Sequence, residues 1–231
     1  MNAPRPELGI VIAAGGSGTR FAAADGSGTG AGKLFAALSA GSSEPLFIHS
    51  IRAFRGICPN DSLILVVRQG FAAEFADALA VAGLTGEARI VEGGDTRMRS
   101  VFNGLKALPE SAEFAAVHDA ARPFATAKLL LGCFDAARKH GGAVVARRVV
   151  DTLKRADTDG FVLDTVDREG LWAVETPQIF PRTELLDAYD KAFAANIAAT
   201  DDAGVMEASK APVFLFEHKG DNRKITFPED L

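Results

Sequence analysis

The sequence is poor in cysteine and histidine. Its 231 residues include two cysteines, Cys58 and Cys133, and four histidines. The cysteines show no CxxC spacing and have no histidine cluster nearby, so we interpret them as small buried thiols rather than as a disulfide or a metal site. The histidines also lack the spacing of metal ligands, and we assign none of them as a catalytic base. The sequence therefore predicts neither a disulfide framework nor a metal site built by protein side chains alone.

The chain also lacks an excess of positive charge and any long apolar run. Its 30 acidic residues outnumber its 25 lysines and arginines, giving a net charge of −5, which argues against broad binding to nucleic acid or membranes. No apolar run reaches the roughly 18 residues of a membrane span. The opening residues, MNAPRPELG, show no basic-then-apolar signal. We therefore expect a cytoplasmic protein in which any site for a polyanion is local.

What is present is an alternation of short apolar runs with helical patterns. Strands that alternate with helices of about 10–15 residues indicate βαβ units and a mostly parallel sheet in a single α/β domain. The expected strands are at 8–14, 62–67, 88–91, 114–118 and 143–146, and the expected helices are at 45–54, 71–82, 100–108 and 128–140.

The pattern changes in residues 147–168. Two extended stretches flank Asp159-Gly160, a strong hairpin signal. They carry few large side chains, so a hairpin of this length should not pack alone. We expect it to project from the domain and to need a partner. Beyond it we expect a helix at 184–195, a helix start at 200–202, a strand at 213–217 and an extended segment at 221–226.

Two well-known phosphate-binding loops nearly fit the glycine-rich region after the first strand, but neither does. The dinucleotide fingerprint GxGxxG places a small residue where this chain has Phe21. The P-loop pattern GxxxxGK[ST] fails because Ser27 replaces its first glycine and Leu34 replaces the hydroxyl that would hold Mg²⁺. A dehydrogenase and a P-loop NTPase are thus disfavoured.

The same region suits nucleotidyl transfer. Backbone N–H groups of residues 15–18 could cup a triphosphate, and two cations, Arg20 and Lys33, follow on either side of a loop. Attack on an α-phosphorus creates a crowded, highly charged transition state, which a protein can stabilise by positioning the reactants and placing cations.

A set of motifs extends this interpretation over the whole chain. AAGGSGTRF followed by GK, then EGGDTRMRSV, HDAARP, VVDTLKR, TVDREGLW, ETPQIF, TDDAGVME and DNRKIT occur in order. With this set, the chain resembles the 2-C-methyl-D-erythritol 4-phosphate cytidylyltransferases of non-mevalonate isoprenoid synthesis from about residue 8 to residue 231. The resemblance implies a Rossmann-like three-layer nucleotidyltransferase fold, with a mostly parallel mixed sheet and a projecting β-arm at about 147–170 that interlocks two subunits into a homodimer.

The resemblance also implies the chemistry. CTP would be the donor, a branched polyol phosphate the acceptor and Mg²⁺ a cofactor held mainly by the triphosphate. Arg20 and Lys33 would stabilise the pentacoordinate phosphorus, while Arg168 and Lys224 would aim the acceptor phosphate. The implied CTP-binding residues are Ala13, Ala14, Gly15, Gly16, Gly18, Gly94, Asp95, Ser100 and Ala120, and the implied acceptor-binding residues are Asp119, Arg122, Thr152, Arg168, Thr200 and Lys224.

Several of these site residues also have a purely structural explanation. Asp95 and Ser100 could cap a helix that starts at Ser100, and Arg122 could be structural because Pro123 follows it. Arg168 and Lys224 could be solvated strand charges. Asp119 is the one residue with a possible metal contact, and Asp95 suits cytosine because a carboxylate accepts from its amino group.

The chain also departs from the family. It has Gly32-Lys33-Leu34 where the family usually shows Pro-Lys-Gln, so Leu34 should lose an amide partner. The acceptor also stays open, because D-ribitol 5-phosphate cytidylyltransferases share most of these motifs. A catalytically silent nucleotide-binding module is the alternative from another class.

Overall fold

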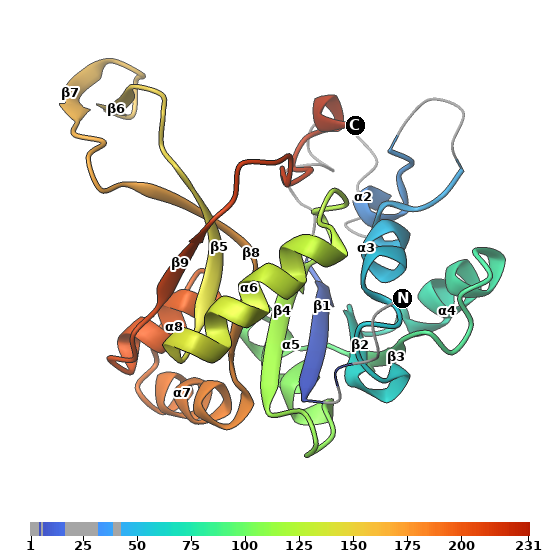
Figure 1. Cartoon of the computed structure of the whole chain (residues 1–231). Helices are drawn as coiled ribbons and strands as arrows, with labels where there is room; N and C mark the ends of the chain where they lie inside the picture. The colour runs from blue at the N-terminus through green and yellow to red at the C-terminus, as the bar shows by residue number, and fades with distance from the viewer. Residues whose placement is uncertain (1–4, 6, 17–31, 39–42) are drawn as a thin grey trace.

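A seven-stranded sheet runs through the middle of the molecule (Figure 1). The computed structural model describes residue 5 and residues 7–16, 32–38 and 43–231. The strand order is β3-β2-β1-β4-β8-β5-β9, and β8 alone runs antiparallel to its neighbours. The strands are β1 (Leu8–Ala14), β2 (Leu63–Val67), β3 (Arg89–Glu92), β4 (Phe114–Asp119), β5 (Ala143–Arg148), β8 (Trp172–Pro181) and β9 (Phe214–Glu217).

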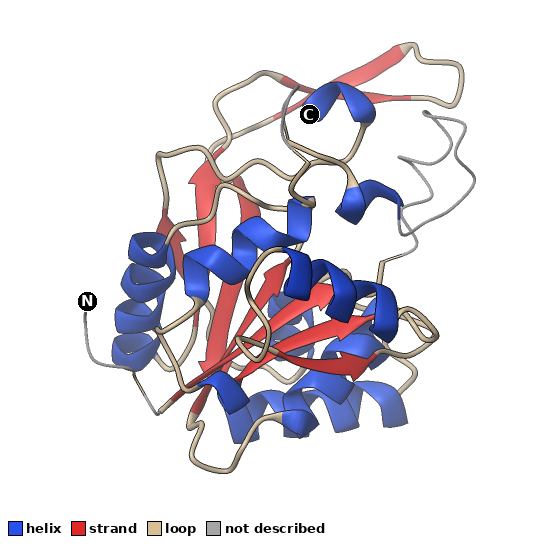
Figure 2. Ribbon diagram, turned by 90° about the vertical axis from the view of Figure 1, so that its right-hand side faces the viewer, coloured by secondary structure: helices blue, strands red, loops and turns tan. Residues whose placement is uncertain are grey.

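Helices cover both faces of this sheet (Figure 2), which makes the three-layer, mostly parallel α/β architecture that was predicted. One apolar cluster lies between the sheet and α3, α4 and α6, and a second lies between the sheet and α5, α7 and α8. The helices are α2 (Gly32–Phe35), α3 (Leu46–Phe54), α4 (Ala72–Val81), α5 (Arg97–Ala107), α6 (Ala127–His140), α7 (Arg182–Ala194) and α8 (Asp202–Ala208), with short 3₁₀ turns η1 (Asn60–Ser62) and η2 (Pro228–Asp230).

The apolar runs become strands because they are buried on both faces. In β1, Ile10 and Ile12 pack into the cluster with α3 and α6, whereas Val11 between them packs into the cluster with α5. All three side chains are fully buried. Successive side chains of a strand point to opposite faces, so a central strand of a covered sheet must be apolar at every position.

The start of α5 differs from the expectation. The helix was predicted from Ser100, but it begins at Arg97 because Thr96 caps it: the Thr96 Oγ1 accepts a hydrogen bond from the Arg99 N–H at 3.1 Å. Such a cap satisfies one of the N–H groups that a helix start leaves without a partner. Ser100 therefore lies in the first turn of the helix and does not cap it.

Strand β8 was missed from the sequence because its middle is polar. Glu175, Thr176 and Gln178 are all buried there, and a cis peptide bond joins Thr176 to Pro177. The Gln178 amide donates to the Asp201 carboxylate at 2.9 Å and its oxygen accepts from the Ala203 N–H at 2.8 Å. Buried polar groups persist where they are hydrogen-bonded, and no apolar pattern announces such a strand.

The hairpin forms the predicted arm. Strands β6 (Leu153–Ala156) and β7 (Val162–Val166) make a separate antiparallel sheet that projects beyond β5 and β8 (Figure 1). Apolar side chains are exposed along it, including Val150, Phe161 and Leu163. Within the described part of the chain, no helix has the length and apolarity to span a bilayer.

Candidate active site

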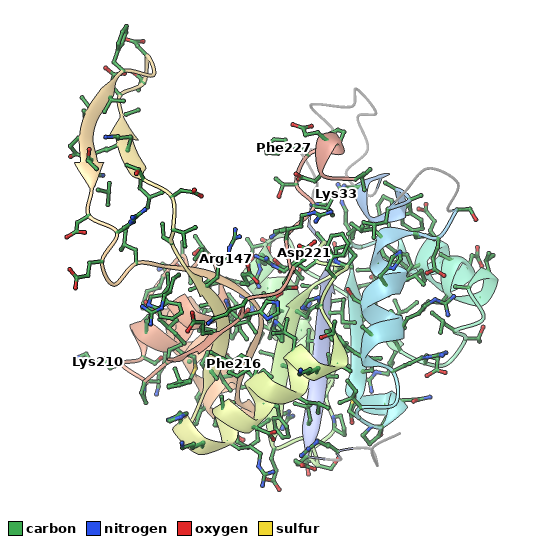
Figure 3. All side chains as sticks on the ribbon, turned by 45° about the horizontal axis from the view of Figure 1, so that its top comes forward. Lys33, Arg147, Lys210, Phe216, Asp221 and Phe227 are labelled. Carbon is green, nitrogen blue, oxygen red and sulfur yellow. The ribbon has the colours of Figure 1, made fainter. Side chains whose placement is uncertain are left out.

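The candidate site lies at the carboxyl ends of β1 and β4. From β1 the strand order runs outward to β2 and β3 on one side and to β4 on the other, which makes this junction the switch point where open α/β sheets bind ligands. A hollow of about 130 Å³ opens here, and Lys33 lies at the same edge of the molecule (Figure 3). The hollow is lined by Ala13, Gly16, Lys33, Leu34, Arg97, Asp119, Ala121 and Lys224.

Asp119 is the centre of charge in the hollow. The Lys224 ammonium donates to its Oδ2 at 2.7 Å, the Arg97 Nη2 lies 3.5 Å from its Oδ1, and the Arg122 Nε lies 4.0 Å from its Oδ2. Burial by itself raises the pKa of Asp119, but Lys224, Arg97 and Arg122 outweigh it and hold that pKa below its ordinary value. The carboxylate therefore stays ionised and keeps the cations close to one another.

Arg97 was not among the predicted site residues. Its Nη2 donates to the Asp202 Oδ2 at 2.9 Å, and the Tyr189 hydroxyl donates to the other oxygen of Asp202 at 2.5 Å. Asp202 is fully buried, so its charge raises the pKa of Arg97 above the ordinary value. Both residues lie in motifs of the sequence, Arg97 in EGGDTR and Asp202 in TDD. No local pattern shows that they pair, because they lie far apart in the chain.

A neutral histidine, His118, is linked to the Asp119 backbone through the Thr176 hydroxyl. His118 is fully buried, and burial lowers its pKa from 6.5 to about 4. Its Nε2 lies 3.2 Å from the Arg122 carbonyl, an acceptor, so we place the proton on Nε2. Its Nδ1 then accepts from the Thr176 hydroxyl at 3.1 Å, and that hydroxyl in turn accepts from the Asp119 N–H at 3.1 Å.

The two predicted lysines, Lys33 and Lys224, meet at residues 224–225. The Lys33 ammonium, on the short helix α2, donates to the Ile225 carbonyl at 3.0 Å, while Lys224 is the residue just before Ile225. Leu34, which replaces the glutamine usual in the family, is buried in the core. This side chain packs in the core and also lines the hollow.

Ser100 joins the glycine turns that follow β1 and β3. Its hydroxyl donates to the Thr96 carbonyl at 2.8 Å and accepts from the Gly94 N–H at 3.1 Å. A Cβ on Gly15 would lie 3.3 Å from this hydroxyl, and one on Gly93 only 2.5 Å away. The structure therefore brings Gly15, Gly94 and Ser100 together, with Asp95 exposed beside them.

Other predicted nucleotide-binding residues offer backbone alone. Ala14 and Ala120 are buried, and the Ala120 N–H donates to the Ala13 carbonyl at 3.1 Å. Gly16 lies open, because a Cβ there would contact nothing within 4 Å. Gly18 and Arg20 lie outside the described residues.

Of the predicted acceptor-binding residues, Asp119, Lys224 and Arg122 lie together, whereas Thr152, Thr200 and Arg168 do not line the hollow. Arg122 is half-buried, and its Nη1 donates to the Asn222 carbonyl at 2.8 Å. Thr200 is exposed just before Asp201, which caps α8. Thr152 and Arg168 are exposed on the arm, where the Arg168 Nη1 donates to the Val150 carbonyl, and neither lines the hollow.

The donor set suits a polyanion better than a bare metal ion. Lys33, Arg97 and Lys224 line the hollow beside the single carboxylate Asp119. Among the described residues, no cluster of three or more histidine, cysteine, aspartate or glutamate side chains could hold a metal ion. Asp119 itself is already paired with cations. A metal ion at this hollow would therefore need ligands from a bound substrate.

Comparison with known proteins agrees with the geometry. The family model of 2-C-methyl-D-erythritol 4-phosphate cytidylyltransferase matches residues 8–231. The curated enzyme of that name from Geobacillus thermodenitrificans is 36% identical over 221 residues, covering 96% of this chain and 92% of the relative. The one from Symbiobacterium thermophilum is 37% identical over 228 residues, covering 97% and 89%. The crystal structure of the Thermus thermophilus enzyme of the same name matches with a TM-score of 0.77 at 30% identity, covering 97% of this chain and 95% of its own.

The buried histidine predicts a pH dependence of stability. The pKa of His118 is about 4 in the folded chain, against an ordinary 6.5. Only the unfolded chain binds this proton between those values, so the free energy of unfolding is fully retained above pH 6.5 and falls by up to about 3 kcal/mol as the pH drops to 4. Asp119, whose pKa is lowered, contributes a loss only below its ordinary value of 3.8.

Urea unfolding of the wild type and of His118→Gln at several pH values between 7.5 and 4.5 measures this effect. We expect a flatter pH dependence for the variant. Identical slopes in the two proteins would show that His118 does not titrate in this way.

Proposed function

The chain belongs to the 2-C-methyl-D-erythritol 4-phosphate cytidylyltransferase family, and on that premise we propose that it transfers the cytidylyl group of CTP to 2-C-methyl-D-erythritol 4-phosphate. The products are 4-diphosphocytidyl-2-C-methyl-D-erythritol and pyrophosphate. The proposal is carried by one observation besides the family: a buried carboxylate gathers cations around a hollow at the switch point of the sheet.

The proposed reaction is an in-line displacement. A phosphate oxygen of the acceptor forms a bond to the α-phosphorus of CTP as the bond to the bridging oxygen of the β-phosphate breaks, and pyrophosphate leaves. The acceptor phosphate is already an anion near neutral pH, so no strong base is needed. The protein therefore acts by positioning the reactants and stabilising charge.

Two cations are assigned to the reacting phosphorus and two to the acceptor. Lys33 lines the hollow together with Gly16, which supports its role at the α-phosphorus. Arg20 is assigned to the same role from the sequence motif. Lys224, at Asp119, and Arg168, on the arm, are assigned to the acceptor phosphate, with Asp119, Arg122, Thr152 and Thr200 as further acceptor contacts.

The nucleotide is assigned to the glycine turns after β1 and β3. Backbone groups of Ala13, Ala14 and Gly15 would contact the base and phosphate, and those of Gly16 and Gly18 would help to hold the triphosphate. Ala120 is a further nucleotide contact. Gly94 and Ser100 would hold the cytosine, and Asp95 would accept from its amino group. Uracil carries an oxygen at that position and would be rejected by the carboxylate.

Mg²⁺ fits this scheme as a companion of the triphosphate. When bound there, it would neutralise phosphate charge and activate the leaving pyrophosphate. The residues of the hollow support this because they offer one carboxylate and several cations, a set suited to a metal that arrives with its own phosphate ligands.

We also propose that two copies of this chain form a cytoplasmic homodimer through the arm. The exposed apolar residues Val150, Phe161, Val162 and Leu163 would be covered by the second arm, since a two-stranded hairpin is marginal alone. Thr152 and Arg168 would then serve the site of the other subunit. Each chain would act as a single catalytic domain with its arm as the dimer contact.

Pyrophosphate release tests the function directly. With CTP and Mg²⁺, we expect release in the presence of 2-C-methyl-D-erythritol 4-phosphate and little with other polyol phosphates. Release only with D-ribitol 5-phosphate would identify the other acceptor. CTP binding without release for any acceptor would indicate a catalytically silent module.

Replacing Lys33 separates turnover from binding. Because Lys33 is assigned to the charge that builds in the transition state, Lys33→Ala should lower kcat by about 10²–10³-fold and change the Kd for CTP by less than about threefold. Lys106→Ala, on the exposed face of α5, is the control with wild-type kinetics. A variant with weakened CTP binding and normal turnover at saturation would refute the assignment.

Mixing inactive subunits tests the shared arm. Lys33→Ala and Arg168→Ala homodimers should both be inactive, but each heterodimer contains one site with both residues intact. Random mixing should therefore restore about a quarter of wild-type activity, since half the dimers are mixed and half of their sites are complete. Heterodimers purified with two affinity tags that remain inactive would exclude sharing of Arg168.

A further inference from the structure

The residue pair Lys224-Ile225 is carried by a segment without strand or helix structure. Residues 221–226, here called the strap, follow β9 and precede η2. Ile225 is fully buried, and its N–H donates to the Ala121 carbonyl at 2.8 Å. The strap brings Lys224 to Asp119 and the Ile225 carbonyl to Lys33. The backbone bond of Ile225 is not part of a ladder, so side chains must also set the position of the strap.

Asn222 is the side chain that docks the strap. It is buried, and its amide nitrogen donates both hydrogens: one to the Glu175 Oε2 and one to the Thr176 carbonyl, each at 2.8 Å. Its own backbone carbonyl accepts from the Arg122 Nη1 at 2.8 Å. One residue thus joins the strap to β8 and to an arginine of the Asp119 cluster.

We propose that Asn222 is a positioning residue for the transfer reaction, which places Lys224 at Asp119 and the Ile225 carbonyl at Lys33 by docking the strap on β8. This inference rests on the proposed function, because it concerns the two lysines assigned to phosphate chemistry. Asn222 itself does not line the hollow and acts through its neighbours.

The chemistry of the contacts calls for an amide. Both partners of the Asn222 side chain are acceptors, and an asparagine has two donors on one nitrogen. An aspartate has none when ionised, so it would place a second carboxylate beside Glu175 and an oxygen against the Thr176 carbonyl. An apolar residue would leave the buried Glu175 carboxylate without this donor, which is costly.

Glu175 also connects the strap to the root of the arm. Its Oε1 lies 3.3 Å from the Arg147 Nε, and Arg147 lies near the end of β5, where the chain leaves for the arm. Figure 3 shows Arg147 at this root, with Asp221 on the strap between it and Lys33. Through Glu175, the strap is therefore connected to both β8 and β5, the two strands that carry the arm.

The test is Asn222→Asp. We expect kcat/KM for the polyol phosphate to fall at least about 30-fold, with the Kd for CTP changed by less than about threefold, because the glycine turns near Ser100 are held by other bonds. Arg223→Ala is the matched control: its side chain is exposed on the same strap, pairs with Asp221 and does not line the hollow. It should keep wild-type kinetics.

The double variant Asn222→Asp/Glu175→Gln tests the proposed contact. The amide introduced at position 175 would donate to the carboxylate introduced at position 222 and remove the repulsion between two carboxylates, while the Thr176 carbonyl would still face an oxygen. We expect partial recovery of kcat/KM, by at least about fivefold over Asn222→Asp. A variant that is merely less stable would not recover in this way.

Limited trypsin digestion reports on the strap without activity. Cleavage after Arg223 and Lys224 should be at least about tenfold faster in Asn222→Asp than in the wild type, at a temperature where both are folded by circular dichroism.

Two kinetic outcomes would refute the inference if the wild type transfers cytidylyl groups. In the first, Asn222→Asp keeps wild-type kinetics; in the second, it loses CTP affinity and turnover equally and the double variant shows no recovery. A wild type inactive with every acceptor would instead refute the proposed function, and equal digestion rates would refute the docking role by themselves.

Discussion

The site depends on one buried carboxylate that holds several cations at the end of β4. Lys224, Arg97 and Arg122 all lie within 4.0 Å of the Asp119 carboxylate. Such cations repel one another across a few ångströms, and the repulsion is stronger near a partly buried site than in water. Asp119 offsets that repulsion before any phosphate is bound. A substrate anion would then meet cations that are already gathered, and little rearrangement would be needed to form their contacts.

The rest of the polar network keeps this charge cluster in place. Asp202 accepts a hydrogen bond from Arg97, while the Thr176 hydroxyl accepts from the Asp119 N–H and donates to His118. Each contact satisfies a buried polar group, and removing one partner of such a pair leaves the other uncompensated. This explains why β8 is rich in polar residues although it lies inside the sheet: it supplies the partners on which the charged residues rely.

Much of the fold could be predicted from local patterns, and the errors have physical causes. The bounds of β1 agree with the expectation from its apolar run, and those of α6 differ by one residue. Strand β8 was missed because its burial is compensated by hydrogen bonds, which leave no hydrophobic period. The start of α5 was placed at Ser100, although Thr96 is the residue whose hydroxyl caps it. Arg97 and Asn222 were missed because both act through partners that are distant in sequence.

The sequence by itself determined the alternation of strands and helices, the arm and the motifs that indicate cytidylyl transfer, because each of these is written in neighbouring residues. Only the tertiary structure decided which charges meet. Lys33, Arg97, Asp119 and Lys224 come from four separate segments. They converge because parallel strands end at one edge of the sheet and because the strap is docked by Asn222. Contacts of this kind depend on strand order and packing, which no local pattern of residues specifies.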